Sequence, residues 1–193
     1  VTYNGQTQGT SVSVTSGTAY DHFDFITTTG KNVGTYDDLT YALTDPTQAA
    51  ILAKNYNVTT TDGTLVITPA ELTVTVNDDN VVYNGRAQKT TATVTSGTNY
   101  DDLAFTAVAA DGSGASAYTK VGTYAMTGTT AADTSNYKVS YVNGTLTIDP
   151  AKATITIPNQ VYWADGTQKN LTAVVTGTVN GEALKYRCLL YTS

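Results

Sequence analysis

Hydrophobic residues alternate with threonine in several short segments of the chain. The clearest of these segments place Leu72, Val74 and Val76, and later Ala153, Ile155 and Ile157, at every second position. A period of two is typical of a β-strand that turns one face to a core and the other to water. The runs at 11–15 and 91–95 alternate in the same way, and both stop at a Ser-Gly-Thr turn. The pattern therefore predicts short strands joined by turns.

Residues 46–54 are the exception to this pattern. Asp45 can cap a helix, Pro46 fits the first helical position, and the residues that follow are mostly good helix formers. The sequence therefore predicts one short helix at 46–54.

The strand pattern recurs along the chain. The segment 55–70 returns at 136–151, 81 positions further on, with nine of its 16 residues unchanged, and Tyr-Asn-Gly at 3–5 returns at 83–85. Such self-similarity predicts tandem modules of about 80 residues. We expect a first repeat at residues 1–70 that lacks its first strand, a complete second repeat at 71–151 and a truncated third repeat at 152–186.

The connections and the last residues lead to two further expectations. Pro69 and Pro150 stand just before the first strand of the next repeat, and proline stiffens such a short joint, so we expect a semi-rigid rod. Residues 187–193 match neither earlier repeat, and we expect them to be a non-native tail. Cys188, which lies in that tail, therefore carries no functional prediction.

These patterns together predict the fold class. We expect an all-β chain of tandem immunoglobulin-like antiparallel β-sandwiches, each with six or seven short strands. The alternative architecture is a β-grasp-like sheet in each repeat. Abundant threonine and valine, together with 14 tyrosines, favour strands over helices.

The charge and the distribution of apolar residues argue against two classes of partner. The net charge is −6, and the ten Lys and Arg residues are scattered, so a phosphate backbone finds no basic stripe and nucleic acid binding is not expected. No uninterrupted apolar run approaches the roughly 18 to 20 residues that cross a bilayer, so membrane insertion is not expected.

The sequence does not indicate a catalytic or metal site. His22 is the only histidine, and Asp102 takes its place in the second repeat, so we expect a surface loop residue rather than a base or a ligand. Acidic clusters that could offer oxygen ligands to Ca²⁺ lie at 21–24, 37–38, 77–80 and 101–102. None has the Asp-X-Asp-X-Asp-Gly spacing of a dedicated calcium loop. We therefore expect ordinary turns and no cofactor, with Ca²⁺ at a joint between repeats as the alternative.

A tyrosine next to an aspartate recurs in one loop of each repeat. Tyr20 and Asp21 in the first repeat correspond to Tyr100 and Asp101 in the second. An aromatic ring beside a carboxylate can stack on and hydrogen-bond a sugar, so these four residues are the candidates for ligand binding. The alternative interpretation is that the recurring tyrosines fill small cores, and it is favoured because their positions are fixed by the repeat.

The recurring motifs resemble those of a known family. Tyr-Asn-Gly is followed by Val-Gly-Thr-Tyr, then Asn-Tyr, then Gly-Thr-Leu-X-Ile-X-Pro-Ala, and this set is similar to the mostly-β, glycine-rich MBG repeats of bacterial extracellular adhesins. The first two repeats look closest to those of lactobacilli and related Gram-positive bacteria. The resemblance covers residues 1–186, with Trp163-Ala164-Asp165-Gly166 in place of Tyr-Asn-Gly in the third repeat.

The resemblance implies a location and a function. It implies a non-enzymatic repeat region of a secreted adhesin, anchored in the bacterial cell wall, whose repeats contact their neighbours in the chain and extend a binding region towards host mucin or extracellular-matrix glycans. It carries no established catalytic residue. Two alternatives stay open: that each repeat is itself a carbohydrate-binding module, and that the chain is an ancillary part of a large secreted enzyme.

Overall fold

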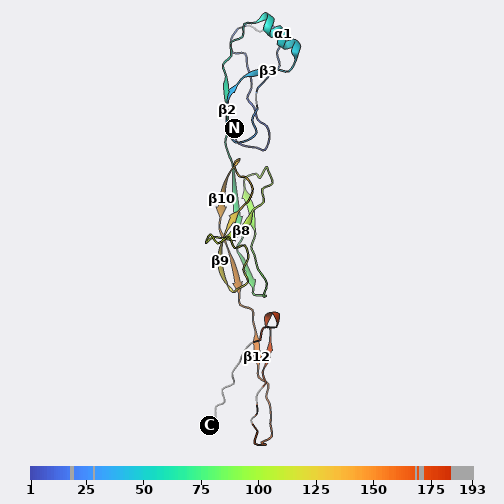
Figure 1. The fold of residues 1–193 in the computed structure, drawn as a ribbon, viewed down its shortest axis with the longest axis vertical. Helices are drawn as coiled ribbons and strands as arrows, with labels where there is room; N and C mark the ends of the chain where they lie inside the picture. Colours follow the sequence, from blue (N-terminus) through green and yellow to red (C-terminus); the bar gives the residue numbers. More distant parts are fainter. Residues whose placement is uncertain (18–19, 28, 168, 170–171, 184–193) are drawn as a thin grey trace. The chain divides into compact units, whose positions relative to one another are not determined.

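The computed structural model describes residues 1–17, 20–27, 29–167, 169 and 172–183 (Figure 1). The described part of the chain consists mostly of strands, with one α-helix, which confirms the predicted all-β class. The expected non-native tail at 187–193, including Cys188, lies outside the described residues, as do the last residues of the third repeat at 184–186.

The strands are short. In chain order they are β1 Phe25–Thr27, β2 Gly34–Leu39, β3 Tyr41–Leu43, β4 Gly63–Ile67, β5 Ala70–Val76, β6 Asp79–Val82, β7 Ala92–Ser96, β8 Thr106–Ala109, β9 Gly122–Thr129, β10 Tyr137–Val142, β11 Gly144–Asp149, β12 Thr154–Thr156 and β13 Val174–Thr176. The α-helix is α1 Pro46–Asn55, and a single 3-10 turn, η1, covers Val179–Gly181.

The chain divides into two compact units whose limits differ from those of the sequence repeats. Unit 1 contains residues 1–74, 94–105 and 130–141, and unit 2 contains residues 75–93, 106–129 and those from 142 onward. Unit 1 therefore combines the first repeat with parts of the second. The repeat boundaries themselves remain a prediction from the sequence.

The core of unit 1 draws on both repeats. Its buried residues are Tyr3, Leu65 and Ile67 from the first repeat, Ala70 at the joint, and Leu72 and Tyr137 from the second. Strands β2 and β4 pair antiparallel, β1 and β3 pair antiparallel, and β5 lies between β7 and β10 in a three-stranded sheet. The alternation predicted for β5 is confirmed, because Leu72 and Val74 are buried while Glu71 is exposed.

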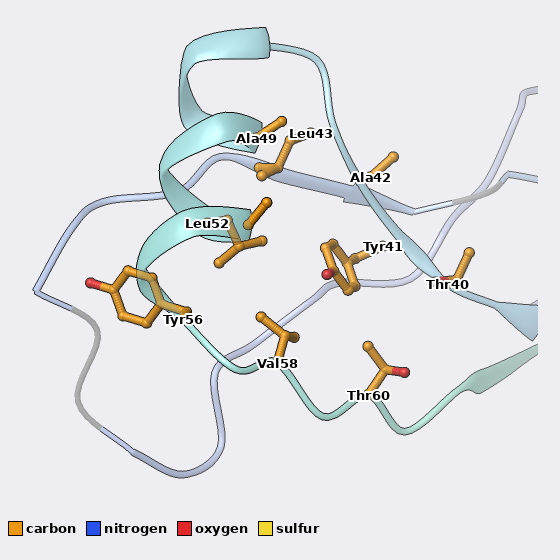
Figure 2. A pocket seen from close by; sticks show the side chains of 10 residues that line it. Thr40, Tyr41, Ala42, Leu43, Ala49, Leu52, Tyr56, Val58 and Thr60 are labelled. Atoms are coloured by element: carbon orange, nitrogen blue, oxygen red, sulfur yellow. The ribbon is translucent and has the colours of Figure 1, made fainter.

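Helix α1 begins and ends close to where the sequence predicts it. The side chain of Asp45 accepts a hydrogen bond from the backbone N–H of Thr47 at 2.7 Å, and Pro46 follows in the first turn. The helix ends at Asn55, and Leu52 is its one buried side chain. A single buried residue means that the helix covers little apolar surface, and Figure 2 shows it above an open pocket.

Unit 2 contains a four-stranded sheet in the order β6-β11-β9-β8. Its core consists of Val76, Ala107, Met126, Leu146 and Ile148. In the third repeat, β12 pairs antiparallel with β13.

One strand pair of unit 2 differs from the predicted antiparallel arrangement, because β6 and β11 run parallel. A parallel pair needs a long connection, and about 60 residues separate these two strands. The backbone N–H of Tyr83 continues the pairing with a 2.8 Å hydrogen bond to the carbonyl of Asp149. The first repeat has the same contact, where Tyr3 N–H donates to Thr68 at 2.9 Å next to a parallel bridge between Thr2 and Thr68.

Among the described residues, none of the helices has the length and apolar character required to cross a bilayer.

Candidate interaction site

Asp101, one of the four candidate residues, lies between two tyrosines in unit 1. The hydroxyl of Tyr3 donates to both carboxylate oxygens of Asp101, at 2.8 and 2.9 Å, and the hydroxyl of Tyr137 donates to Oδ2 at 2.9 Å. The backbone N–H of Asp101 donates in turn to the Tyr137 hydroxyl at 3.0 Å. Tyr3 comes from the first repeat, so this carboxylate joins consecutive repeats.

Aromatic packing surrounds this carboxylate. The ring of Tyr3 meets Tyr100 edge-on at 6.0 Å between centroids and meets Tyr137 in the same way at 5.4 Å. Gly5, in the Tyr-Asn-Gly turn, lies so close to Tyr100 that an added Cβ would stand 2.9 Å from the Cβ of that tyrosine. The turn of the first repeat therefore rests directly on the loop of the second.

Burial controls the ionisation of the two tyrosines. Tyr3 is 2% exposed and Tyr137 is 6% exposed. Burial, followed by the hydrogen bond to Asp101, raises the pKa of Tyr137 to about 12 and raises the pKa of Tyr3 above its ordinary value. Both phenols are therefore neutral near pH 7 and act as hydrogen-bond donors to the carboxylate.

In the corresponding loop of the first repeat, one tyrosine donates a hydrogen bond to the aspartate, whereas two tyrosines do so in the second repeat. The hydroxyl of Tyr56, which corresponds to Tyr137, donates to Oδ2 of Asp21 at 2.9 Å and accepts from the backbone N–H groups of Tyr20 and Asp21 at 3.0 and 3.1 Å. The ring of Tyr20 is 87% exposed, whereas Tyr100 is 43% exposed beside Tyr3. The ligand-binding role of these four residues stays a prediction.

Two cavities with mixed polar and apolar linings lie close to Tyr56. A cavity of about 570 Å³ lies beneath α1, and Figure 2 shows the side chains of Tyr41, Leu52, Tyr56 and Val58 around it. A second cavity, of about 540 Å³, lies between residues 10–17 and 57–63. The first repeat therefore has open surface of mixed polarity.

The remaining sequence candidates make other contacts. Nε2 of His22 is 3.0 Å from Oδ1 of Asp24, and both side chains are mostly exposed. Hydrogen bonds from Gln48 and then from His22 lower the pKa of Asp24. Asp78 accepts the backbone N–H and the hydroxyl of Thr145 at 2.8 and 2.7 Å, which ties the residues just after β5 to β11. In the described part of the chain, no three His, Cys, Asp or Glu residues form a group that could hold a metal ion.

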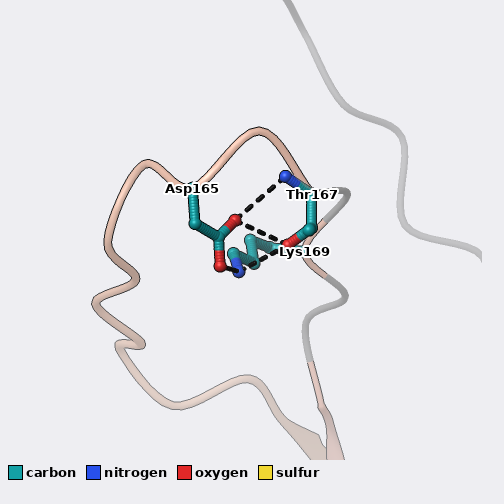
Figure 3. Close-up of polar contacts among 3 residues, drawn as sticks. All are labelled: Asp165, Thr167 and Lys169. Carbon is teal, nitrogen blue, oxygen red and sulfur yellow. Dashed lines mark hydrogen bonds and ion pairs between the residues drawn. The ribbon is translucent and has the colours of Figure 1, made fainter.

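The third repeat keeps the turn geometry despite its different sequence. Oδ1 of Asp165 accepts from the backbone N–H of Thr167 at 2.9 Å, as Asn4 and Asn84 do for the residues two positions after them, and Lys169 contacts Asp165 and Thr167 (Figure 3). The hydrogen bond from Lys169 is the main reason that the pKa of Asp165 falls to about 2. The side-chain oxygens of Asn4, Asn84 and Asp165 therefore accept the same hydrogen bond in the matching turn of each repeat.

The structural role of Tyr3 is the part of the site that the sequence did not predict. The recurrence of Tyr-Asn-Gly marks Tyr3 as a fixed position, but it does not say what the ring contacts. Its partner Asp101 lies 98 positions further along the chain and belongs to the next repeat.

The arrangement defines an all-β chain in which segments far apart in the sequence share one core. The family model described as MBG domain (YGX type) matches residues 72–147, so this segment is an MBG domain and the predicted MBG repeat is confirmed there. Such a domain indicates the repeat region of a surface protein. No curated protein and no solved structure matches the sequence.

Proposed function

We propose that this chain is a non-enzymatic stalk region of a bacterial cell-surface adhesin of the type found in lactobacilli, in which MBG repeats extend a binding region from the cell wall. The observation that supports this proposal most directly is the contact of Tyr3 with Asp101 and Tyr137. The recurring tyrosine of one repeat is used to hold the next repeat. On this proposal, the recurring motifs connect neighbouring repeats.

A glycan array and immobilised mucin, probed with the complete chain, test this proposal. We expect no saturable binding, because Tyr100 and Asp101 are already engaged with Tyr3. The second test is the coding sequence that flanks this segment. There we expect a secretion signal, further repeats and a wall-sorting motif. A flanking catalytic domain would contradict the stalk proposal and favour an ancillary part of an enzyme.

Direct carbohydrate binding is the second candidate function, and one observation favours it. Tyr20 is 87% exposed beside Asp21 and has the ring and the carboxylate that sugar stacking requires. Binding on the array that is lost in Tyr20→Ala would establish this function. Tyr162→Ala, which changes another exposed tyrosine far from that loop in the sequence, is the matched control.

A further inference from the structure

An asparagine is followed directly by a glycine at four places in the sequence. Such a pair can react with itself, because glycine has no Cβ to hinder the approach of its nitrogen to the asparagine side chain. All four asparagines are exposed, so access of water does not distinguish them. The four pairs are Asn4-Gly5, Asn84-Gly85, Asn143-Gly144 and Asn180-Gly181.

The hydrogen bond made by Oδ1 of the asparagine controls this reaction. The glycine nitrogen attacks Cγ and passes its proton to water, and negative charge then develops on Oδ1. A backbone N–H that already donates to Oδ1 stabilises this charge. When that N–H belongs to the residue two positions further on, it also folds the side chain back over the peptide link, which brings Cγ towards the attacking nitrogen.

Two of the four pairs have this hydrogen bond. Oδ1 of Asn4 accepts from the backbone N–H of Gln6 at 2.9 Å, and Oδ1 of Asn84 accepts from the backbone N–H of Arg86 at 2.9 Å. The glycines that follow them have φ values of 73° and 72°. The Tyr-Asn-Gly turns of the first two repeats therefore hold the reacting groups in the same arrangement.

The pair at Asn143 lacks this arrangement, because the N–H that would be needed is used elsewhere. The backbone N–H of Thr145 donates to Oδ1 of Asp78 at 2.8 Å. Gly144 is the first residue of β11, and a Cβ placed on it would stand 2.3 Å from the carbonyl oxygen of Val76. The main chain here is held in a sheet and has little room to rotate towards the side chain.

The pair at Asn180 lacks the arrangement for a similar reason. The backbone N–H of Glu182 donates to the carbonyl of Val179 at 3.0 Å and closes the 3-10 turn η1. It is therefore not directed at Oδ1 of Asn180.

We infer that Asn84 and Asn4 are sites of spontaneous deamidation, whereas Asn143 and Asn180 keep their amides in the folded chain. Ring closure between the glycine nitrogen and Cγ expels the side-chain nitrogen as ammonia and leaves a cyclic imide. Water then opens the imide at one of its two carbonyls and gives aspartate or isoaspartate. The reaction consumes one water, releases one ammonia and needs no enzyme. This inference goes beyond the proposed stalk function, because it assigns a chemical modification to the recurring turn.

The two products should affect the turn differently. Aspartate fits, because Asp165 in the matching turn of the third repeat accepts the same hydrogen bond from the N–H of Thr167 at 2.9 Å. Isoaspartate adds one carbon to the main chain just before the glycine. A Cβ on Gly85 would already stand 2.0 Å from Nδ2 of Asn180, so there is no room for a shift in that direction. Isoaspartate at Asn84 should therefore loosen the contact between the turn and Asn180.

Incubation of the complete chain at near-neutral pH, followed by peptide mapping, tests this inference. Mass spectrometry detects the replacement of the amide by a carboxylate, and an isoaspartyl methyltransferase labels the isoaspartate. Asn84 and Asn4 should convert at least about 10-fold faster than Asn143 and Asn180. In denaturant the four rates should become similar, because the hydrogen bonds that distinguish the pairs are lost.

The effect on the turn is tested in the modified chain. Hydrogen exchange at 179–182 should be at least about 3-fold faster in the isoaspartate form, separated by ion exchange, than in the unmodified chain. Freshly purified Asn84→Asp is the matched control. It has the charge of the product on a main chain of normal length, and it should leave this exchange unchanged.

Three results would overturn the inference. Equal rates at the four asparagines of the folded chain would mean that the turn does not promote the reaction. A rate difference that persists in denaturant would assign it to neighbouring residues instead of the fold. Unchanged exchange at 179–182 in the isoaspartate form would show that the modification does not reach the contact with Asn180.

Discussion

Val14 and Val94 occupy matching positions in the first two repeats, but only one of them is part of a sheet. Val94 lies in β7 and packs against the core of unit 1, whereas Val14 is 57% exposed in a segment that forms no strand. The local sequences are closely similar, so intrinsic propensity cannot account for the difference. The difference is β5, which pairs with β7 in the second repeat. Strand formation in these repeats therefore depends on the central strand.

Removing a core contact of β5 should have the largest effect on stability and on the difference between the two repeats. Leu72→Ala should lower the free energy of unfolding by about 2–5 kcal/mol, because Leu72 is 1% exposed and its loss leaves a cavity. Hydrogen exchange at 94–96 should then approach the rate at 14–16. Val14→Ala is the control and should change stability by less than about 1 kcal/mol, because the side chain is mostly exposed. Unchanged protection at 94–96 despite the loss of stability would refute the role of β5.

Removal of a tyrosine hydroxyl should lower the free energy of unfolding by a smaller amount. Tyr137→Phe removes the donor to Oδ2 of Asp101 and leaves a carboxylate with fewer partners in a partly buried site, so a loss of about 1–2 kcal/mol is expected in denaturant unfolding. The matching change, Tyr56→Phe, should cost less, because its hydrogen bond to Asp21 is exposed to water. Equal losses in the two variants would mean that burial beside Tyr3 does not distinguish the two loops.

The same hydroxyl predicts a dependence of stability on alkaline pH. The pKa of Tyr137 is raised from 10.0 to about 12 in the folded state. Below pH 10 the folded and unfolded states both keep the proton, so this tyrosine contributes its full stability. Between pH 10 and about 12 the unfolded state loses the proton first, and the free energy of unfolding falls. The fall should be shallower in Tyr137→Phe, and parallel curves for the variant and the wild type would exclude this residue as the cause.

The smallest effect is expected from the ion pair between β5 and β10. Nζ of Lys138 lies 3.2 Å from Oε1 of Glu71, and both side chains are largely exposed. Such a pair is screened by water and salt, so Lys138→Met should change the melting temperature by no more than about 2 °C. Asn57 takes the place of Lys138 in the first repeat, so Asn57→Met is the matched control. A larger loss for Lys138→Met that disappears at high salt would show that charge contributes to holding β5.

The sequence predicted where strands and the helix form better than it predicted which segments they contact. Alternation located β5, and the capping residue with the following proline located α1, because both signals are local. Recurrence identified Tyr100 and Asp101 as fixed positions, but their contact with Tyr3 depends on residues nearly 100 positions apart. A period of two shows which face of a strand is apolar and does not show which repeat will cover that face.

The parallel pair of β6 and β11 was missed for a related reason. The pattern of a strand is the same whether its neighbour runs parallel or antiparallel, and the connection between these strands contains several others. Only the three-dimensional structure shows that the turn at Tyr83 lies beside the end of β11 at Asp149.

The core of unit 1 has a consequence for how such a chain can change in length. The first repeat supplies Tyr3, Leu65 and Ile67, and the second supplies Leu72 and Tyr137, so each repeat contributes residues from both its beginning and its end. A repeat that can supply both sets resembles a monomer in a linear polymer, with one contact surface for the repeat before it and another for the repeat after it. Duplication or deletion of one whole repeat by recombination would join a new pair of matching ends. Copy number could then vary between genes without the evolution of a new interface.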